Sequence, residues 1–308
     1  MRVADPLLPL GQALLEHGYR FTTVTPATHT RINARPGNDT TGSLEGVFGW
    51  NRIARDGALP ADVLAAGRQA GVLIPHGSGW RSTLRASTVG EHLYFHSSFP
   101  TSQHDAVFFG PDTYRFVAAI DAYLAAGRPV RRAVDVGCGA GPGAVVVALA
   151  HPDAEVLAVD INDTALRLTA VNASLAGATN VQACRSDLLS AVEGEFDLIV
   201  ANPPYLLDPR ERVYRHGGGG LGEGLSLAIA ALAGSRLAKG GALVLYTGSA
   251  VVNGVDAFRA AVMPRLDAAG LATSYRELDP DVFGEELLEP AYVMADRIAA
   301  VLVTATRA

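Results

Sequence analysis

The chain has 308 residues, of which 49% are hydrophobic, and its formal net charge is −6 at pH 7. A chain of this length and composition can hold a domain of about 200 residues together with a smaller one. The negative net charge argues against a protein that relies on nonspecific affinity for nucleic-acid phosphates.

Membrane and redox signals in the sequence point to the cytoplasm. No apolar stretch reaches the ~18 residues of a membrane-spanning helix, and the first residues lack the basic-then-apolar pattern of a signal peptide. The two cysteines, Cys138 and Cys184, are too few for a disulfide framework and fit a reducing compartment. We therefore expect a cytoplasmic protein without a membrane partner.

Residues 1–105 predict a small α+β accessory domain. Apolar spacing predicts two helices, two short apolar runs predict a hairpin, and a stretch rich in Thr, Pro, Asn and Gly predicts an irregular connection. The helices are expected over 6–17 and 61–70, the hairpin over 84–88 and 92–97, and the irregular connection over 22–41. Helices followed by a hairpin permit a winged-helix-like arrangement. Substrate recognition and a lid or dimer surface are both open as the role of this domain.

The histidines of this region do not indicate a metal site. Six of the eight histidines precede residue 106, and His92 and His96 share a face in either a helix or a strand. A zinc site needs further ligands, and this part of the chain has no cysteine. We therefore expect no bound metal.

A glycine-rich turn follows an apolar run at residues 133–143, which read Ala-Val-Asp-Val-Gly-Cys-Gly-Ala-Gly-Pro-Gly. Together with the helix-like run 144–150, this predicts a strand–loop–helix unit of the kind that binds nucleotide-like ligands. The pattern is not that of dinucleotide-binding turns, because Pro142 occupies their third glycine position. Cys138 is expected to fill space in this loop rather than act as a nucleophile.

A second strand is expected over 155–159, and it ends at Asp160-Ile161-Asn162. A carboxylate at the tip of the second strand can accept hydrogen bonds from both ribose hydroxyls of a nucleoside, although a solvated strand end is the alternative. Asn162 is expected to cap the helix 163–175.

A third strand is expected over 180–184 and leads to Ser186-Asp187-Leu188. Ser-Asp is also a common helix start, so these residues alone do not define a ligand contact.

The fourth strand, expected over 196–200, leads to Asn202-Pro203-Pro204-Tyr205. Two successive prolines turn the chain sharply, and the turn can aim the Asn202 side chain and the Pro203 carbonyl at one point. Two acceptors beside the flat face of Tyr205 suit a planar NH₂ group, such as an amide or the exocyclic amine of a base.

The segment after this motif carries three arginines and four successive glycines. A mobile loop that closes over a substrate or contacts phosphates and an unconstrained surface loop are both open. The loop residues are Arg210, Arg212, Arg215 and Gly217 to Gly220.

After this loop, a helix is expected over 225–237, a fifth strand over 242–246 and a last strand over 299–304.

In this order, the four strand-end signals resemble class I S-adenosylmethionine-dependent methyltransferases over about residues 106–308. The Asn-Pro-Pro-Tyr motif is similar to that of the release-factor glutamine methyltransferases and related small-domain N-methyltransferases. Residues 108–115, Phe-Phe-Gly-Pro-Asp-Thr-Tyr-Arg, resemble the Pro-x-Thr-Glu segment of the release-factor enzymes, with Tyr114 in place of their glutamate.

The resemblance implies a Rossmann-like α/β domain with a seven-stranded, mostly parallel sheet, preceded by the accessory domain 1–105. It implies that Asp135 orients the amino-acid part of the cofactor, S-adenosylmethionine, and that Asp187 meets its adenine amino group. The cofactor-binding residues would be Thr113, Asp135, Gly137, Cys138, Gly139, Gly141, Asp160, Ile161, Asp187, Leu188 and Asn202. The catalytic residues would be Asn202, Pro203, Pro204 and Tyr205.

The predicted function is an enzyme that transfers a methyl group to a planar nitrogen on a macromolecule. A protein glutamine side chain is favoured as the acceptor, because residues 108–115 resemble that branch. An amino group of an RNA or DNA base is the first alternative. A nucleic-acid-binding regulator with a vestigial cofactor fold is an alternative of another class.

Overall fold

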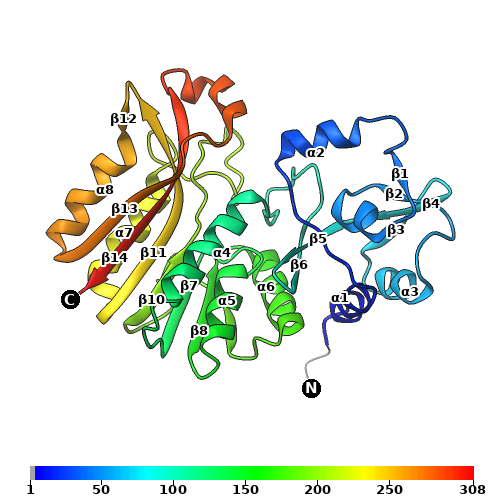
Figure 1. Ribbon diagram of the computed structural model, residues 1–308, viewed down its shortest axis with the longest axis horizontal. Helices are drawn as coiled ribbons and strands as arrows, with labels where there is room; N and C mark the ends of the chain where they lie inside the picture. The colour runs from blue at the N-terminus through cyan, green and yellow to red at the C-terminus, as the bar shows by residue number, and fades with distance from the viewer. Residues whose placement is uncertain (1–3) are drawn as a thin grey trace.

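The computed structural model describes residues 4–308, so the first three residues of the expected accessory domain lie outside it. The chain forms an N-terminal lobe and a larger C-terminal lobe, which lie side by side (Figure 1). The N-terminal lobe contains helices α1 (Leu7–Glu16), α2 (Pro26–Asn33) and α3 (Ala61–Gln69), a short helical turn (Glu45–Gly49), and strands β1 (Thr40–Thr41), β2 (Ile53–Ala54), β3 (Leu73–His76) and β4 (Gly79–Ser82).

Helix α1 forms where apolar spacing predicts a helix. Leu7, Leu10 and Leu14 recur at helical spacing, and all three are fully buried in the core of the lobe. Four short strands form a small sheet in the order β1-β2-β4-β3.

The prediction of an irregular connection over 22–41 was wrong, because this stretch contains α2. The Thr25 side chain caps α2 by accepting from the Thr28 amide, and Pro26 stands at the first helical position, where its missing N–H is not needed. Burial of His29 against Trp50 and Phe99 holds the helix in place, since the ring centroids lie 5.4 and 4.1 Å away.

The predicted hairpin forms as β5 (Leu84–Val89) and β6 (His92–Ser97), paired antiparallel with Leu84 opposite Ser97. It is a separate two-stranded sheet rather than part of the small sheet. Asn172, which is fully buried, fixes the hairpin to the C-terminal lobe: its side chain accepts from Phe95 N at 2.9 Å and donates to the carbonyls of Phe95 and Ala140. The winged-helix-like arrangement and the domain boundary at 105 stay predictions.

The C-terminal lobe alternates strands and helices. Its helices are α4 (Pro111–Leu124), α5 (Pro142–Ala150), α6 (Asp163–Ala176), α7 (Gly224–Arg236) and α8 (Ala257–Ala268). Its strands are β7 (Arg132–Val136), β8 (Glu155–Asp160), β9 (Val181–Arg185), β10 (Phe196–Ala201), β11 (Leu237–Val252), β12 (Val255–Asp256), β13 (Leu271–Asp279) and β14 (Arg297–Arg307). Two short helical turns, Gly284–Leu288 and Pro290–Tyr292, lie between β13 and β14.

Seven strands form the main sheet in the order β13-β14-β11-β10-β7-β8-β9, and the short β12 pairs with β11. The five strands from β11 to β9 run parallel, whereas β14 is antiparallel to both of its neighbours. The predicted seven-stranded, mostly parallel sheet is therefore confirmed.

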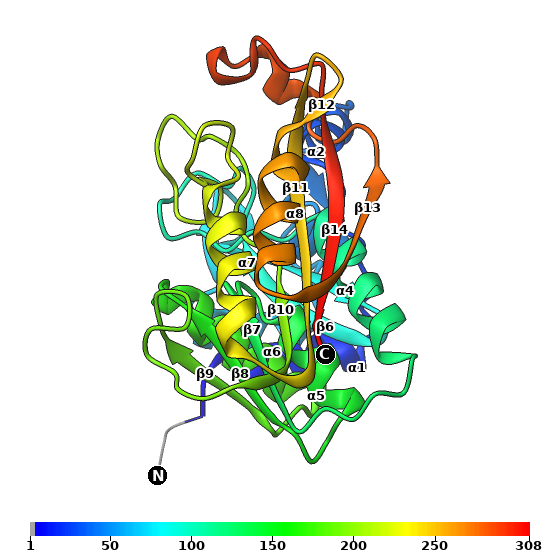
Figure 2. The same ribbon diagram turned by 90° about the vertical axis from the view of Figure 1, so that its left-hand side faces the viewer.

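Helices cover both faces of this sheet, which is why its central strands are apolar almost throughout. Alternate residues of β11 pack to opposite sides: Leu243 and Leu245 face the layer that contains Phe258 of α8, and Val244 and Tyr246 face the other layer. Figure 2 shows α7 and α8 on one face and α4 on the other. The carboxyl ends of the parallel strands are left free to form a site.

Candidate active site

A cavity lies at the carboxyl ends of β7, β8, β9 and β10, where ligands of open α/β sheets bind. The structure brings most of the predicted site residues into its wall. These are Thr113, Gly137, Cys138, Gly139, Asp160, Ile161, Asp187, Leu188, Asn202, Pro203, Pro204 and Tyr205. Two predicted residues, Asp135 and Gly141, do not line it.

The glycine-rich loop leaves open space on the cavity side. Gly139 has φ +56°, a conformation that favours glycine, and a Cβ built there meets no atom within 4 Å. The Gly139 amide donates to Asp160 Oδ2 at 3.0 Å, and its carbonyl accepts from the Thr169 hydroxyl at 3.0 Å. The loop is thus held by the next strand end and by α6, with its backbone exposed to a ligand.

Two other residues of the loop, Gly141 and Cys138, have structural roles. A Cβ on Gly141 would meet the Thr169 side chain at 2.8 Å, so this glycine permits the close packing of the loop on α6. Cys138 is buried, and burial raises the pKa of its thiol well above the ordinary value. This cysteine lines the cavity as an apolar group and not as a thiolate nucleophile.

Asp135 lies beneath the glycine-rich loop rather than in the cavity wall. Its side chain is buried, and Oδ2 accepts from the Ala144 amide at the start of α5, at 2.9 Å. Burial raises the pKa of this carboxyl to about 7, and the charge of Asp160 adds to the shift. Asp135 is therefore not placed to contact a ligand in the cavity directly.

The two other carboxylates stand at the strand ends as expected. Asp160 accepts from the amides of Gly139 and Asn162, at 3.0 and 2.9 Å, and burial raises its pKa. Asn162 caps α6 as predicted, since its side chain accepts from Thr164 N at 2.9 Å. Asp187 is exposed in the cavity wall, and none of the residues described here hydrogen-bonds to its carboxylate.

The Asn202-Pro-Pro-Tyr turn follows β10 directly, and all four residues line the cavity. Among residues 4–308, nothing donates a hydrogen bond to the Asn202 side chain or to the Pro203 carbonyl. Tyr205 is 8% exposed, and its ring meets Phe283 edge-on at 6.0 Å. Two free acceptors therefore stand beside a fixed aromatic wall.

The Tyr205 ring is held by a carboxylate to which the sequence analysis assigned no role. The buried carboxylate of Asp112 accepts from the hydroxyls of Tyr205 and Tyr246, each at 2.6 Å, and from Arg115 at 3.2 Å. Tyr246 comes from β11 and Asp112 from the first turn of α4. Only the Pro-Asp-Thr pattern at the start of α4 indicated that this region belongs to the site; nothing in the sequence around Tyr246 did.

Tyr114 lies away from the cavity. Its hydroxyl accepts from the Thr23 amide at 2.9 Å, and its ring meets Phe109 edge-on at 5.8 Å. The residue that replaces the expected glutamate therefore joins α4 to the N-terminal lobe. His96 is likewise structural, since its buried ring stacks on Phe109 and bonds to the Ser87 hydroxyl.

The arginine-bearing loop packs closely against the motif. Arg212 forms two bonds to the Asp208 carboxylate, at 2.6 and 2.8 Å, and Arg215 pairs with the buried Glu286. A Cβ on Gly217 would meet Gly222 O at 2.0 Å and Pro204 O at 2.6 Å. Gly217 therefore lets the loop approach the backbone of Pro204 closely, and the role of the loop as a mobile lid stays a prediction.

Comparisons with known proteins agree with this geometry. The family profile described as "Methyltransferase small domain" matches residues 122–251. The release factor glutamine methyltransferase of Cereibacter sphaeroides is 32% identical over 207 residues, which are 61% of this chain and 72% of that protein. The chain is a class I S-adenosylmethionine-dependent methyltransferase.

One further relative matches this methyltransferase over a shorter stretch, and a solved structure resembles it in fold. The ribosomal protein uL3 glutamine methyltransferase of Xanthomonas campestris is 36% identical over 122 residues, which are 39% of each chain. The tRNA m1G37 methyltransferase of M. jannaschii has a TM-score of 0.51 at 14% identity, covering 76% of this chain and 59% of that one. That second likeness shows a shared fold alone.

The cavity suits the family's cofactor, S-adenosylmethionine. The free space above Gly139 admits a ligand against the backbone, and carboxylates stand at the ends of β8 and β9. Within residues 4–308, no three His, Cys, Asp or Glu side chains gather to hold a metal ion. No helix in that range is long and apolar enough to cross a membrane.

Proposed function

We propose that this methyltransferase transfers the methyl group to the side-chain nitrogen of a glutamine in a protein. The observation that carries the proposal is the pair of free acceptors, Asn202 Oδ1 and the Pro203 carbonyl, in the cavity wall. An amide nitrogen has two N–H groups in one plane, and two acceptors on one turn match that arrangement.

The residues of the cavity divide into two groups in this proposal. Asp160 would accept from the ribose hydroxyls of the cofactor, Asp187 from its adenine amino group, and the backbone at Gly137 and Gly139 would lie beneath it. Asp135 would act from below the loop, because it fixes the start of α5 and does not reach the cavity.

The bound cofactor supplies an electrophilic methyl group on a sulfonium. Transfer would break the carbon–sulfur bond as the carbon–nitrogen bond forms, with the bonding electron pair left on sulfur. The amide nitrogen then loses one proton to solvent. Asn202 and the Pro203 carbonyl would hold the N–H groups, so that the nitrogen lone pair points at the methyl carbon. Alignment of nitrogen, carbon and sulfur is the main contribution that the protein must make.

Tyr205 forms the wall against which the planar amide would lie. Its hydroxyl donates to the buried Asp112, which also accepts from Tyr246, and this network fixes the ring before any acceptor arrives. A fixed wall reduces the conformational freedom that acceptor binding must remove.

Two observations favour a protein acceptor over a nucleic-acid base. The relatives with the stronger sequence similarity carry the names of glutamine methyltransferases that act on a release factor or a ribosomal protein. Two of the three loop arginines that would have met phosphates are held in ion pairs, Arg212 with Asp208 and Arg215 with Glu286. Both cysteines are free thiols, which fits a reaction in the reducing cytoplasm.

The test is transfer of labelled methyl groups into extract from cells that lack this protein. We expect the label in a protein band, as N-methylglutamine after hydrolysis under conditions that preserve the side-chain amide. Label in nuclease-sensitive material would overturn the proposal in favour of a base.

The variant that tests the role of the Asn202 side chain is Asn202→Ala. We expect cofactor affinity to stay nearly unchanged while single-turnover transfer falls by at least about a hundredfold, because this amide would act on the acceptor in the transition state. Lost cofactor affinity with an unchanged rate would assign Asn202 to the cofactor instead.

A further inference from the structure

Three exposed apolar side chains lie on the segment between β13 and β14, which also contributes Phe283 to the cavity wall. Leu288 is 88% exposed, Val293 74% and Met294 67%, and these are the three most exposed large apolar side chains among the described residues. This segment lies at the top of the C-terminal lobe, near β12 (Figure 1). Exposed apolar side chains gathered on one segment mark interaction sites more often than scattered ones do.

The same segment is strongly acidic. From Glu277 to Asp296 the chain has seven acidic residues and no lysine or arginine. Three of the carboxylates are paired with arginines, and four are exposed without such a partner in the described part of the chain: Asp281, Glu285, Glu289 and Asp296. We call Leu288, Val293 and Met294, together with Asp281, Glu285 and Glu289, the rim surface.

The rim surface is joined to the wall of the active site. Phe283, within the segment, lines the cavity and meets the Tyr205 ring. Glu286 pairs with Arg215, which also lines the cavity. The Tyr292 hydroxyl accepts from the Leu207 amide at 2.8 Å, two residues after Tyr205. The segment that carries the rim surface is therefore packed against the wall of the active site.

The chemistry of the rim surface selects one kind of partner. Unpaired carboxylates repel phosphates and attract ammonium and guanidinium groups, and apolar side chains favour other apolar side chains. We infer that the rim surface binds a polypeptide segment of the methyl acceptor that carries lysine or arginine next to apolar residues. This inference rests on the proposed function, and it names the sequence around the acceptor glutamine that the enzyme would select.

The test compares two synthetic peptides of equal length in the presence of S-adenosylhomocysteine. Each has one central glutamine, flanked by Lys and Leu in the first peptide and by Glu and Ser in the second. We expect the Lys/Leu peptide to bind at least about tenfold more tightly in fluorescence anisotropy. Its lysines would form three exposed charge pairs with the carboxylates of the rim surface, and its leucines would contact the apolar side chains.

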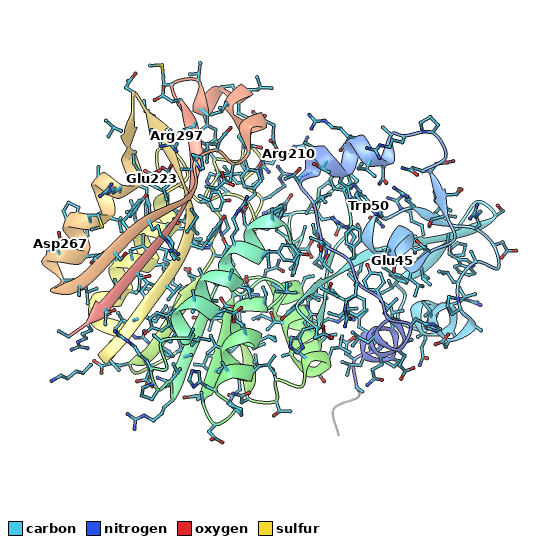
Figure 3. The ribbon with its side chains drawn as sticks, in the orientation of Figure 1. Glu45, Trp50, Arg210, Glu223, Asp267 and Arg297 are labelled. Carbon is cyan, nitrogen blue, oxygen red and sulfur yellow. The ribbon has the colours of Figure 1, made fainter. Side chains whose placement is uncertain are left out.

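Two variants separate the charged and apolar parts of the surface. We expect Asp281→Asn/Glu285→Gln/Glu289→Gln to remove most of the preference, and Leu288→Ser/Val293→Ser/Met294→Ser to weaken the Lys/Leu peptide severalfold. The control is Asp153→Asn/Glu193→Gln/Asp267→Asn, which removes three exposed, unpaired carboxylates from other elements and should change nothing. Figure 3 shows Asp267 at the left-hand edge of the lobe, away from the segment between β13 and β14 at its top.

The outcomes for the rim surface and for the proposed function are distinct. Equal binding of both peptides, or unchanged binding by the rim variants, would overturn the rim surface even if label enters a protein band. Selective binding without methyl transfer to any protein would keep the rim surface and contradict the proposed function. A change of oligomeric state in the apolar variant, with peptide affinity unchanged, would show that a second copy covers this surface instead.

Discussion

Asp135 is a buried carboxyl whose pKa is raised from 3.8 to about 7 by desolvation. A carboxyl with a raised pKa in the folded state stabilises the fold below its unfolded pKa, and this stability is lost as the pH rises through the folded pKa. The window here runs from about pH 4 to about pH 7. The full shift corresponds to about 4 kcal/mol in the free energy of unfolding.

Asp135→Asn removes this titration and keeps an oxygen for the Ala144 amide. From about pH 5 to about pH 8, we expect the free energy of unfolding of the unsubstituted protein to fall by roughly 2–3 kcal/mol more than that of the variant. Urea unfolding of both proteins at the two pH values measures the difference. Parallel pH profiles would show that Asp135 is ionised throughout this range.

Gly139 provides a second prediction, because its neighbourhood is open. In Gly139→Val the side chain occupies the space above the loop, so we expect cofactor binding to fall below detection in calorimetry. Gly127→Val is the control: Gly127 also has a positive φ (+69°) and no atom within 4 Å of a built Cβ, but it lies outside the cavity. Both variants carry the same kind of backbone strain. Equal loss of cofactor affinity in both would assign the effect to strain.

At the residue scale, the sequence predicted groups at strand ends and missed groups brought together by packing. Asp160 and Asp187 follow apolar strands directly, and the carboxyl ends of parallel strands meet at one edge. Tyr246 is 134 residues from Asp112 in the chain. Its hydroxyl reaches the Asp112 carboxylate only because β11 pairs with β10 and so lies over α4. No local pattern encodes such a distance.

At the scale of elements, the loop after Tyr205 is expected to position the Asn202-Pro-Pro-Tyr turn. Gly217→Ala sets a Cβ against the carbonyls of Gly222 and Pro204, without requiring a positive φ. We expect turnover to fall by about a hundredfold, since a shift of about 1 Å in the acceptor site has that effect, while cofactor affinity changes little. The measurement is single-turnover transfer beside calorimetry.

Gly220→Ala is the matched control within the same loop. A Cβ there meets only Glu223 Oε1, at 3.7 Å, which is ordinary contact, and Gly220 has no positive φ. Its activity should stay close to that of the unsubstituted enzyme. An equal loss in both variants would mean that the loop acts through its flexibility.

The elements themselves were predictable wherever burial dictated the pattern. The central strands are covered on both faces, so their residues are apolar almost without break, and β8 and β10 were predicted to within one residue. Helix α2 has little apolar periodicity, and it is held by the Thr25 cap and by contacts of His29 with residues far along the chain. Such contacts are tertiary and leave no local signal.

At the scale of the whole molecule, the salt dependence of acceptor binding separates the two classes of acceptor. A protein acceptor should change its apparent affinity only severalfold between about 50 and about 200 mM salt. A nucleic acid would displace counterions, and a fall of two orders of magnitude or more would contradict a protein acceptor. Arg210→Ala is the suitable variant, because Arg210 is exposed, whereas Arg212 and Arg215 stabilise the loop through ion pairs (Figure 3).

Strand β14 lies between β11 and β13, although both of those strands precede it in the chain. During synthesis on the ribosome, the outer edge of β11 therefore has no partner until residues 297–307 have emerged. This edge belongs to a strand of 16 residues that is mostly buried in the finished protein. Unpaired apolar edges of this kind invite pairing with other chains. The nascent enzyme should thus depend on chaperones for as long as β14 remains inside the ribosome.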